Sequence, residues 1–356
     1  MTWAGVQGHD NIVEQFRRAL VSGRFASTYL FVGPAGIGKR LFAMKLAQAL
    51  LCERNPAQDL DPCGFCPACQ QVDALSHPDL EVITKPKDRS FIPIELFIGD
   101  RDHRMREGLC HRIALKPFRG GRKVAIIDDA DFLNQEGANC LLKTLEEPPP
   151  HSMIVLIGTS EQKQLPTIRS RCQVIRFRPL PEETVAQLLV SQSLVDDADE
   201  AARLAGLSGG SLQRALESAD EQVGEFRQML LTELSRSDWD SVELSKTMGQ
   251  FVDAAGKEAP PRRARLNRLI GYTAQFYEQL MRSLSGGTVH GDAELVRAVR
   301  AAQSTWPGDA ETAAACLERC LEAEGQVLAN ANQATLVQCW LDELATTTRT
   351  GCPVAA

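Results

Sequence analysis

The chain has 356 residues, of which 44% are hydrophobic and 24% are charged, and its net charge is −7. This length predicts two or three domains with a sizeable core, and the balance of residue types is that of ordinary globular proteins. The negative charge excludes a basic field over the whole molecule that would draw the chain onto nucleic acid. The sequence has no signal-peptide pattern and no run of 18 apolar residues. We therefore expect a cytoplasmic protein that does not span a membrane.

A helix, a strand and a second helix are predicted at the start of the chain. Apolar residues recur at helical spacing over residues 11–20, which indicates an amphipathic helix. Residues 28–32 form a short apolar run typical of a buried strand, and residues 41–51 are rich in alanine and leucine and predict the next helix.

A glycine-rich run, Gly-Pro-Ala-Gly-Ile-Gly-Lys-Arg at residues 33–40, joins this strand to the second helix. It fits the phosphate-loop pattern G-x-x-x-x-G-K up to the last position, where serine or threonine is expected. Gly33, Gly36 and Gly38 would turn backbone N–H groups around phosphate oxygens, and Lys39 would reach the terminal phosphates. Arg40 replaces the hydroxyl that normally binds Mg²⁺, and it argues against ATP hydrolysis. A glycine-rich turn without a ligand is the alternative.

Four of the eleven cysteines follow closely after the second helix. Cys52, Cys63, Cys66 and Cys69 have the spacing C-x10-C-x2-C-x2-C, in which two overlapping C-x2-C turns bring thiolates to the range that tetrahedral zinc needs. Four thiolates complete the ligand shell, so the pattern predicts a structural Zn²⁺ site. An iron–sulfur cluster and four free thiols are the alternatives.

Two carboxylates end a later apolar run. Residues 80–83 and 124–127 predict strands, and the second is followed by Asp128 and Asp129. This is the Walker B pattern, in which Asp128 would hold Mg²⁺ through water. Asp129 stands where a glutamate usually polarises the attacking water. The alternative is an acidic strand end without a chemical role.

Further strands are predicted at residues 153–158 and 173–177, with a helix over residues 134–147 that three prolines terminate. Thr159 follows the first of these strands and could sense a γ-phosphate. Five short apolar strands that alternate with helices indicate an α/β fold with a parallel sheet covered on both faces. Residues 91–111 carry no assigned role, and we expect a solvated helical face over residues 100–111, with a DNA contact as the alternative.

The rest of the chain is predicted to be helical. A short helical unit spans residues 182–220, and residues 351–356 are predicted to be a disordered tail. Six helical segments are predicted between them, at residues 223–234, 241–255, 261–284, 293–304, 310–330 and 334–344.

Together these motifs resemble the bacterial clamp-loader AAA+ proteins. The resemblance rests on the phosphate loop, the cysteine cluster inserted after its helix, the Ile-Asp-Asp-Ala-Asp run at residues 127–131, the Leu-Leu-Lys-Thr-Leu-Glu-Glu-Pro run at residues 141–148 and Ser-Arg-Cys at residues 170–172. It implies an AAA+ P-loop core with a zinc module in residues 1–178, a small helical lid in residues 179–220 and an all-α collar in residues 221–356.

Departures from the family pattern distinguish among its subunits. The ATP-hydrolysing gamma/tau subunits have serine or threonine, glutamate and arginine where this chain has Arg40, Asp129 and Gln213. The Ser-Arg-Cys motif is intact, and the resemblance implies that Arg171 acts as an arginine finger in a neighbouring subunit's ATP site. A structural salt bridge is the alternative for Arg171.

The resemblance therefore implies a delta-prime-like stator that helps to load the sliding clamp on primed DNA. Its implied partners are the gamma/tau and delta subunits in a hetero-oligomer, together with the clamp and DNA. Zn²⁺ is the expected cofactor, and bound ATP with Mg²⁺ is left open. An active gamma/tau-like ATPase is the first alternative, and a zinc-stabilised AAA+ binding module outside replication is the second.

Overall fold

The computed structural model describes residues 3–86, 89, 91–118 and 121–352. By their internal contacts these residues form two compact units, residues 1–215 and 216–356. The predicted division into three domains stays a prediction. Residues 180–215 lie within the first unit and have a small hydrophobic cluster of their own around Leu189 and Leu204.

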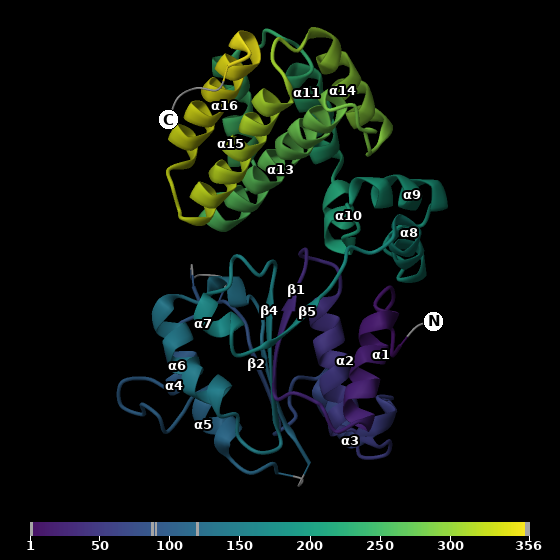
Figure 1. Ribbon diagram of the computed structural model, residues 1–356, viewed down its shortest axis with the longest axis vertical. Helices are drawn as coiled ribbons and strands as arrows, with labels where there is room; N and C mark the ends of the chain where they lie inside the picture. Colours follow the sequence, from purple (N-terminus) through teal and green to yellow (C-terminus); the bar gives the residue numbers. More distant parts are fainter. Residues whose placement is uncertain (1–2, 87–88, 90, 119–120, 353–356) are drawn as a thin grey trace. The chain divides into compact units, whose positions relative to one another are not determined.

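The first unit is built on a five-stranded parallel sheet, as the sequence predicts, with the strand order β2-β3-β4-β1-β5 (Figure 1). Three central strands, β1, β3 and β4, are buried along their whole length, which explains their nearly continuous apolar sequences. The strands are β1 (Thr28–Val32), β2 (Leu80–Ile83), β3 (Lys123–Ile127), β4 (Ser152–Gly158) and β5 (Gln173–Arg176).

Helices cover both faces of the sheet (Figure 1). One face packs against α1 (Asp10–Val21), α2 (Lys39–Leu51) and α3 (Pro67–Asp73), in a core that contains a cluster of aromatic rings around Phe16 and Phe42. The other face packs against α4 (Glu95–Ile98), α5 (Leu109–Ala114), α6 (Gln135–Glu146) and α7 (Pro166–Arg169).

The segment at residues 100–108 differs from its prediction. Residues 100–107 are exposed and non-helical, mostly in turns and bends, Gly108 is buried, and helix α5 begins only at Leu109. Gly99 and Gly108 bound the segment with φ values of +80° and +84°, a backbone region that does not continue a helix. The expected solvent exposure is therefore found over residues 100–107 but not at residues 108–110, and the expected helix is found only from residue 109 onward.

The small helical unit after β5 contains α8 (Glu182–Ser191), α9 (Ala198–Leu207) and α10 (Leu212–Ser218). Two short 3₁₀ helices, η1 (Ala57–Asp59) and η2 (Ala130–Phe132), complete the first unit.

The second unit is helical in its described residues, as predicted. Its core includes Trp340, Phe276 and Tyr277, all of them fully buried. Four of its helices begin at an aspartate whose side chain accepts backbone N–H groups, which is a strong helix start signal. The helices are α11 (Glu221–Leu234), α12 (Ser241–Asp253), α13 (Ala259–Leu284), α14 (Ala293–Thr305), α15 (Ala310–Leu328) and α16 (Gln333–Thr350). Of the predicted tail, residues 353–356 lie outside the described residues.

Candidate functional site

The predicted nucleotide-site residues lie at the carboxyl ends of three neighbouring strands. Strand β4 lies between β1 and β3 in the sheet. The phosphate loop follows β1, the Asp128-Asp129 pair follows β3, and Thr159 follows β4. Because parallel strands end at the same edge, this order brings the loop, the acids and the threonine together, at the position where open α/β sheets bind ligands.

Two glycines of the phosphate loop lie too close to neighbouring atoms to carry a side chain. A Cβ atom on Gly33 would lie 2.3 Å from the carbonyl oxygen of Phe177, which follows β5. A Cβ atom on Gly36 would lie 2.4 Å from the Cβ of Gln213, and the Gly36 carbonyl accepts a hydrogen bond from Leu212 N–H at 3.1 Å. The start of α10 therefore packs directly on the loop.

Lys39 is buried at the start of α2, with 6% of its surface exposed. Its ammonium group donates to the carbonyl oxygens of Gly33 and Pro34, at 2.6 and 2.5 Å. Burial lowers the Lys39 pKa from 10.5 to about 8, although the nearby Asp131 and Asp128 oppose this change. The lysine is thus placed inside the loop and hydrogen-bonded to the loop's own backbone.

Arg40 forms an ion pair with the Walker B acid. Its Nη1 lies 3.1 Å from Asp128 Oδ2, and Asp128 Oδ1 accepts the Asp129 N–H at 3.0 Å. Mg²⁺ in such sites prefers oxygen ligands and is repelled by a guanidinium group. Since the hydroxyl ligand is missing and the acid is paired with a cation, these residues do not fit Mg²⁺.

Asp129 has a left-handed backbone with φ of +58°. Its carboxylate accepts the N–H of Lys85, which lies just beyond β2, at 3.4 Å. Strand β2 is on the opposite side of β3 from β1. Burial, followed by the charge of Asp128, raises the Asp129 pKa. The carboxylate is therefore bonded on the side away from the phosphate loop, and protonation would weaken it as a base.

Thr159 is held by an acid that the sequence analysis did not single out. Asp131 accepts from both the N–H and the hydroxyl of Thr159, at 2.9 and 2.5 Å, and from the side-chain amide of Gln164. The hydroxyl proton of Thr159 is thus used within the chain. Asp131 lies in the Ile-Asp-Asp-Ala-Asp run at residues 127–131, so the signal was present, but its spacing does not reveal the partner.

His9 is a second residue that sequence reasoning missed. Its Nε2 lies 2.7 Å from the carbonyl oxygen of Ile37, inside the phosphate loop, and its ring packs edge-on against Phe177. Burial lowers its pKa. A carbonyl oxygen can only accept, so the neutral His9 carries its proton on Nε2 and supports the loop from the N-terminal side.

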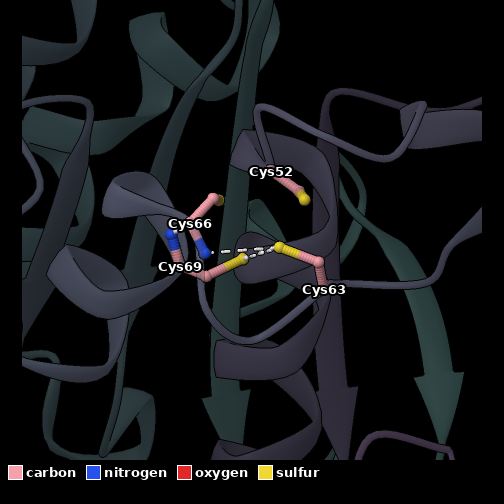
Figure 2. A group of neighbouring side chains, drawn as sticks. All are labelled: Cys52, Cys63, Cys66 and Cys69. Carbon is pink, nitrogen blue, oxygen red and sulfur yellow. Dashed lines mark hydrogen bonds between the residues drawn. The ribbon is translucent and has the colours of Figure 1, made fainter.

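The four cysteines converge at the other end of α2 (Figure 2). Cys52 is the residue directly after the helix, Cys63 and Cys66 come from the turn that leads into α3, and Cys69 lies in the first turn of α3. Their sulfur atoms all lie within 4.8 Å of one another, and the Cys63 and Cys69 sulfurs are 3.9 Å apart. Zinc–sulfur bonds of about 2.3 Å place tetrahedral sulfurs roughly 3.8 Å apart, so this set fits a metal ion with four thiolate ligands.

Backbone N–H groups support these sulfurs. Those of Asn55, Cys66 and Cys69 each point to a cysteine sulfur at 3.4 Å. Such donors stabilise thiolates and orient them, as outer-shell hydrogen bonds do in other metal sites.

Arg171 lies after α7 and pairs with Glu146, at the end of α6. Its Nε donates to Glu146 Oε1 at 2.6 Å, and its Nη1 donates to the Thr167 carbonyl at 2.9 Å and to Ser170 Oγ at 3.1 Å. Its side chain is 30% exposed. The Ser-Arg-Cys and Leu-Glu-Glu-Pro motifs are therefore joined in space, with the guanidinium group held at the surface of the first unit.

Cys172, the third residue of the Ser-Arg-Cys motif, packs against the core on this side of the sheet. Burial raises its pKa to about 12. A thiol of this kind stays protonated and is a poor nucleophile.

No helix among the described residues is both long enough and apolar enough to span a bilayer.

Comparison with known proteins places the chain among subunits of DNA polymerase III. The family model described as DNA polymerase III, delta subunit, matches residues 8–181. The DNA polymerase III subunit delta-prime of Pseudomonas aeruginosa is 34% identical over 241 residues, which cover 64% of this chain and 70% of that protein. The tau subunit of Escherichia coli is 31% identical over 226 residues, which are 62% of this chain but only 33% of the tau subunit.

A solved structure of a DNA polymerase III gamma subunit-related protein from Thermotoga maritima matches 95% of this chain and 99% of its own, at 15% identity. Its TM-score is 0.38. The sequence relatives share this chain's clamp-loader family. This chain belongs to the clamp-loader family of bacterial DNA polymerase III subunits that includes delta-prime.

Proposed function

We propose that this protein is the delta-prime-like stator of a bacterial clamp loader, and that it does not hydrolyse ATP itself. One observation carries the proposal: the Arg40–Asp128 ion pair places a fixed cation on the acid that an ATPase needs for Mg²⁺. The bonding of Asp129 toward β2 supports it, because that carboxylate is not directed at the loop. In this role the chain assembles with gamma/tau and delta subunits, and the assembly opens the sliding clamp and places it on primed DNA in the cytoplasm.

Arg171 supplies the chemical contribution of this subunit in our proposal. Its guanidinium group would stabilise charge on the γ-phosphoryl group in a neighbouring subunit's ATP site. Three hydrogen-bond acceptors around Arg171 support this role, because they limit the rotation of a long side chain before the neighbour arrives. The conformational entropy of the Arg171 side chain is then already reduced before the subunits assemble.

The cysteine cluster, in our proposal, holds one structural Zn²⁺. Four thiolates leave no open position for water or substrate, as is usual in structural zinc sites. The ion would fix the segment between α2 and α3 and would take no part in the phosphate chemistry. This assignment is independent of the stator role.

A reconstituted assembly tests the proposal most directly. Every motor subunit except the neighbour of this chain would carry an alanine in place of its phosphate-loop lysine, so that the neighbour alone hydrolyses ATP. We expect Arg171→Ala to lower this turnover by about 10³–10⁵-fold. Arg169→Ala is the matched control, since Arg169 lies two residues away and donates only a long hydrogen bond to the Glu161 carbonyl, at 3.4 Å. Equal turnover in the two variants would rule out the arginine finger.

Hydrolysis by the isolated chain separates the stator from an active gamma/tau-like ATPase. We expect negligible turnover with Mg²⁺, both with and without primed DNA. Turnover at the rate of the motor subunits that disappears in Lys39→Ala would overturn the stator proposal.

A further inference from the structure

Arg40, the residue after the loop lysine, places its guanidinium group where a phosphate-loop protein normally binds Mg²⁺. Arg40 and Asp128 occupy the two positions from which a hydroxyl and a carboxylate normally reach Mg²⁺. They are 88 residues apart in the chain and 3.1 Å apart in space. The Asp128 side chain is only 16% exposed, whereas that of Arg40 is 49% exposed. The guanidinium group thus neutralises the acid and keeps an exposed side.

The rest of the loop retains what phosphate binding requires. Gly36 and Gly38 have φ values of +73° and +94°, which allow successive N–H groups to face one centre. Lys39 lies beside that centre, and within the described part of the chain its hydrogen-bond acceptors are the carbonyls of Gly33 and Pro34. A phosphate oxygen is a stronger acceptor for an ammonium group than a neutral carbonyl.

We propose that this loop binds a nucleoside diphosphate without a metal ion, and that Arg40 takes the place of Mg²⁺ as the countercharge. Lys39 turns from the loop carbonyls to the phosphates, and the exposed side of Arg40 binds a second phosphate oxygen while Asp128 holds the guanidinium group in place. The inference goes beyond the stator role, which requires no nucleotide in this subunit.

Charge counting selects the diphosphate. Mg²⁺, an aspartate and a lysine would together carry two positive charges. Arg40, Asp128 and Lys39 carry one, and the nearby Asp131 lowers the total further. A site with one positive charge fewer favours the ligand with fewer negative charges, because excess charge in a partly desolvated site is costly. The metal-bound form of the nucleotide is disfavoured as well, since Mg²⁺ would lie against the guanidinium group.

Calorimetric titration of the full chain with ADP tests this inference, first in EDTA and then in excess Mg²⁺. We expect the wild-type chain to bind ADP in EDTA and to bind it several-fold more weakly in Mg²⁺. Arg40→Thr restores the usual hydroxyl and frees Asp128. It should lose about tenfold or more of the affinity in EDTA, as expected for a lost charged hydrogen bond, and should bind ADP more tightly when Mg²⁺ is added.

Two further variants control this experiment. Arg40→Lys keeps the charge and should retain binding in EDTA. Arg17→Thr removes an arginine of similar exposure, 44%, whose ion pair with Glu14 lies on α1, and it should behave as wild type. Tighter binding of ADP to the wild-type chain in Mg²⁺ than in EDTA would overturn the inference, as would the absence of binding in EDTA. A chain that loads clamps but binds no ADP would refute this inference and leave the stator role intact.

Discussion

The two ends of helix α2 carry two candidate ligand sites of opposite character. At its C-terminal end, four cysteines meet, and every side chain is a donor of the same kind. At its N-terminal end, Lys39 donates to its own loop, and Arg40 pairs with Asp128. As thiolates the four cysteines could not neutralise one another, so in our proposal that end holds an external cation. The phosphate site contains both signs of charge and is satisfied internally. A site of the first kind depends on its ligand for stability, and a site of the second kind does not.

Among the substitutions at the two ends of α2, removal of one cysteine should therefore lower the free energy of unfolding the most. We expect Cys66→Ser to abolish the binding of about one zinc ion per chain and to lower the free energy of unfolding by about 4 kcal/mol, as is usual when a structural metal is lost. Metal analysis and urea denaturation measure the two effects. Cys140→Ser, on α6 outside the cluster, should keep the metal. Full zinc content in Cys66→Ser would show that the cysteine end of α2 does not depend on all four thiolates to bind the metal.

At the phosphate end, Asp131 and Asp128 should contribute unequally to the free energy of unfolding. Asp131→Ala leaves the Thr159 N–H and the Gln164 amide without their acceptor, and we expect a loss of about 2 kcal/mol in the free energy of unfolding. Asp128→Ala removes an ion pair whose arginine is half exposed, and we expect a loss below about 1 kcal/mol. The same urea titrations check both values. A larger loss in Asp128→Ala would show that the ion pair is a structural element of the fold.

The pH dependence of stability should reveal the buried lysine. Burial places the Lys39 pKa at about 8 in the folded chain, below the ordinary 10.5, so the unfolded chain binds more protons between these values. Stability from this group is lowest below pH 8 and rises as the pH increases from 8 toward 10.5. Compared with Lys39→Met, we expect the wild-type chain to gain about 1 kcal/mol between pH 8 and pH 9. Parallel stability curves for the two proteins would show that Lys39 keeps its ordinary pKa.

Much of the fold could be predicted from the sequence because its signals are local. The buried strands are short apolar runs, the longer helices show helical spacing, and seven of the described helices begin at an aspartate or asparagine that accepts backbone N–H groups. Helix α16 is the main underestimate. It was predicted to end at residue 344 and continues to Thr350. Threonines disfavour helices intrinsically, but Thr347 and Thr348 are buried here, and Thr348 contacts the Tyr277 hydroxyl. Packing overrides the local preference.

The candidate site was predicted only as a set of positions. The motifs identified the positions of the loop, the acids and Arg171, and the spacing of the cysteines identified their cluster. The pairs Arg40–Asp128 and Arg171–Glu146 could not be predicted, because each joins residues from different elements at a distance that only the strand order determines. The same is true of Asp131, whose role depends on the adjacent end of β4.

Gly33 and Gly36 have a consequence for how such sequences evolve. Any side chain at Gly33 would collide with the backbone at Phe177, and one at Gly36 would collide with Gln213. Natural selection for a folded protein is therefore enough to keep both glycines in a lineage that has ceased to use ATP. A Cβ atom on Gly38 would meet nothing closer than 3.9 Å, but its φ of +94° favours glycine there as well. The glycine pattern of a phosphate loop can thus be kept without ATP hydrolysis. The residue after the loop lysine, Arg40 in this chain, is a better indicator of whether such a protein hydrolyses ATP.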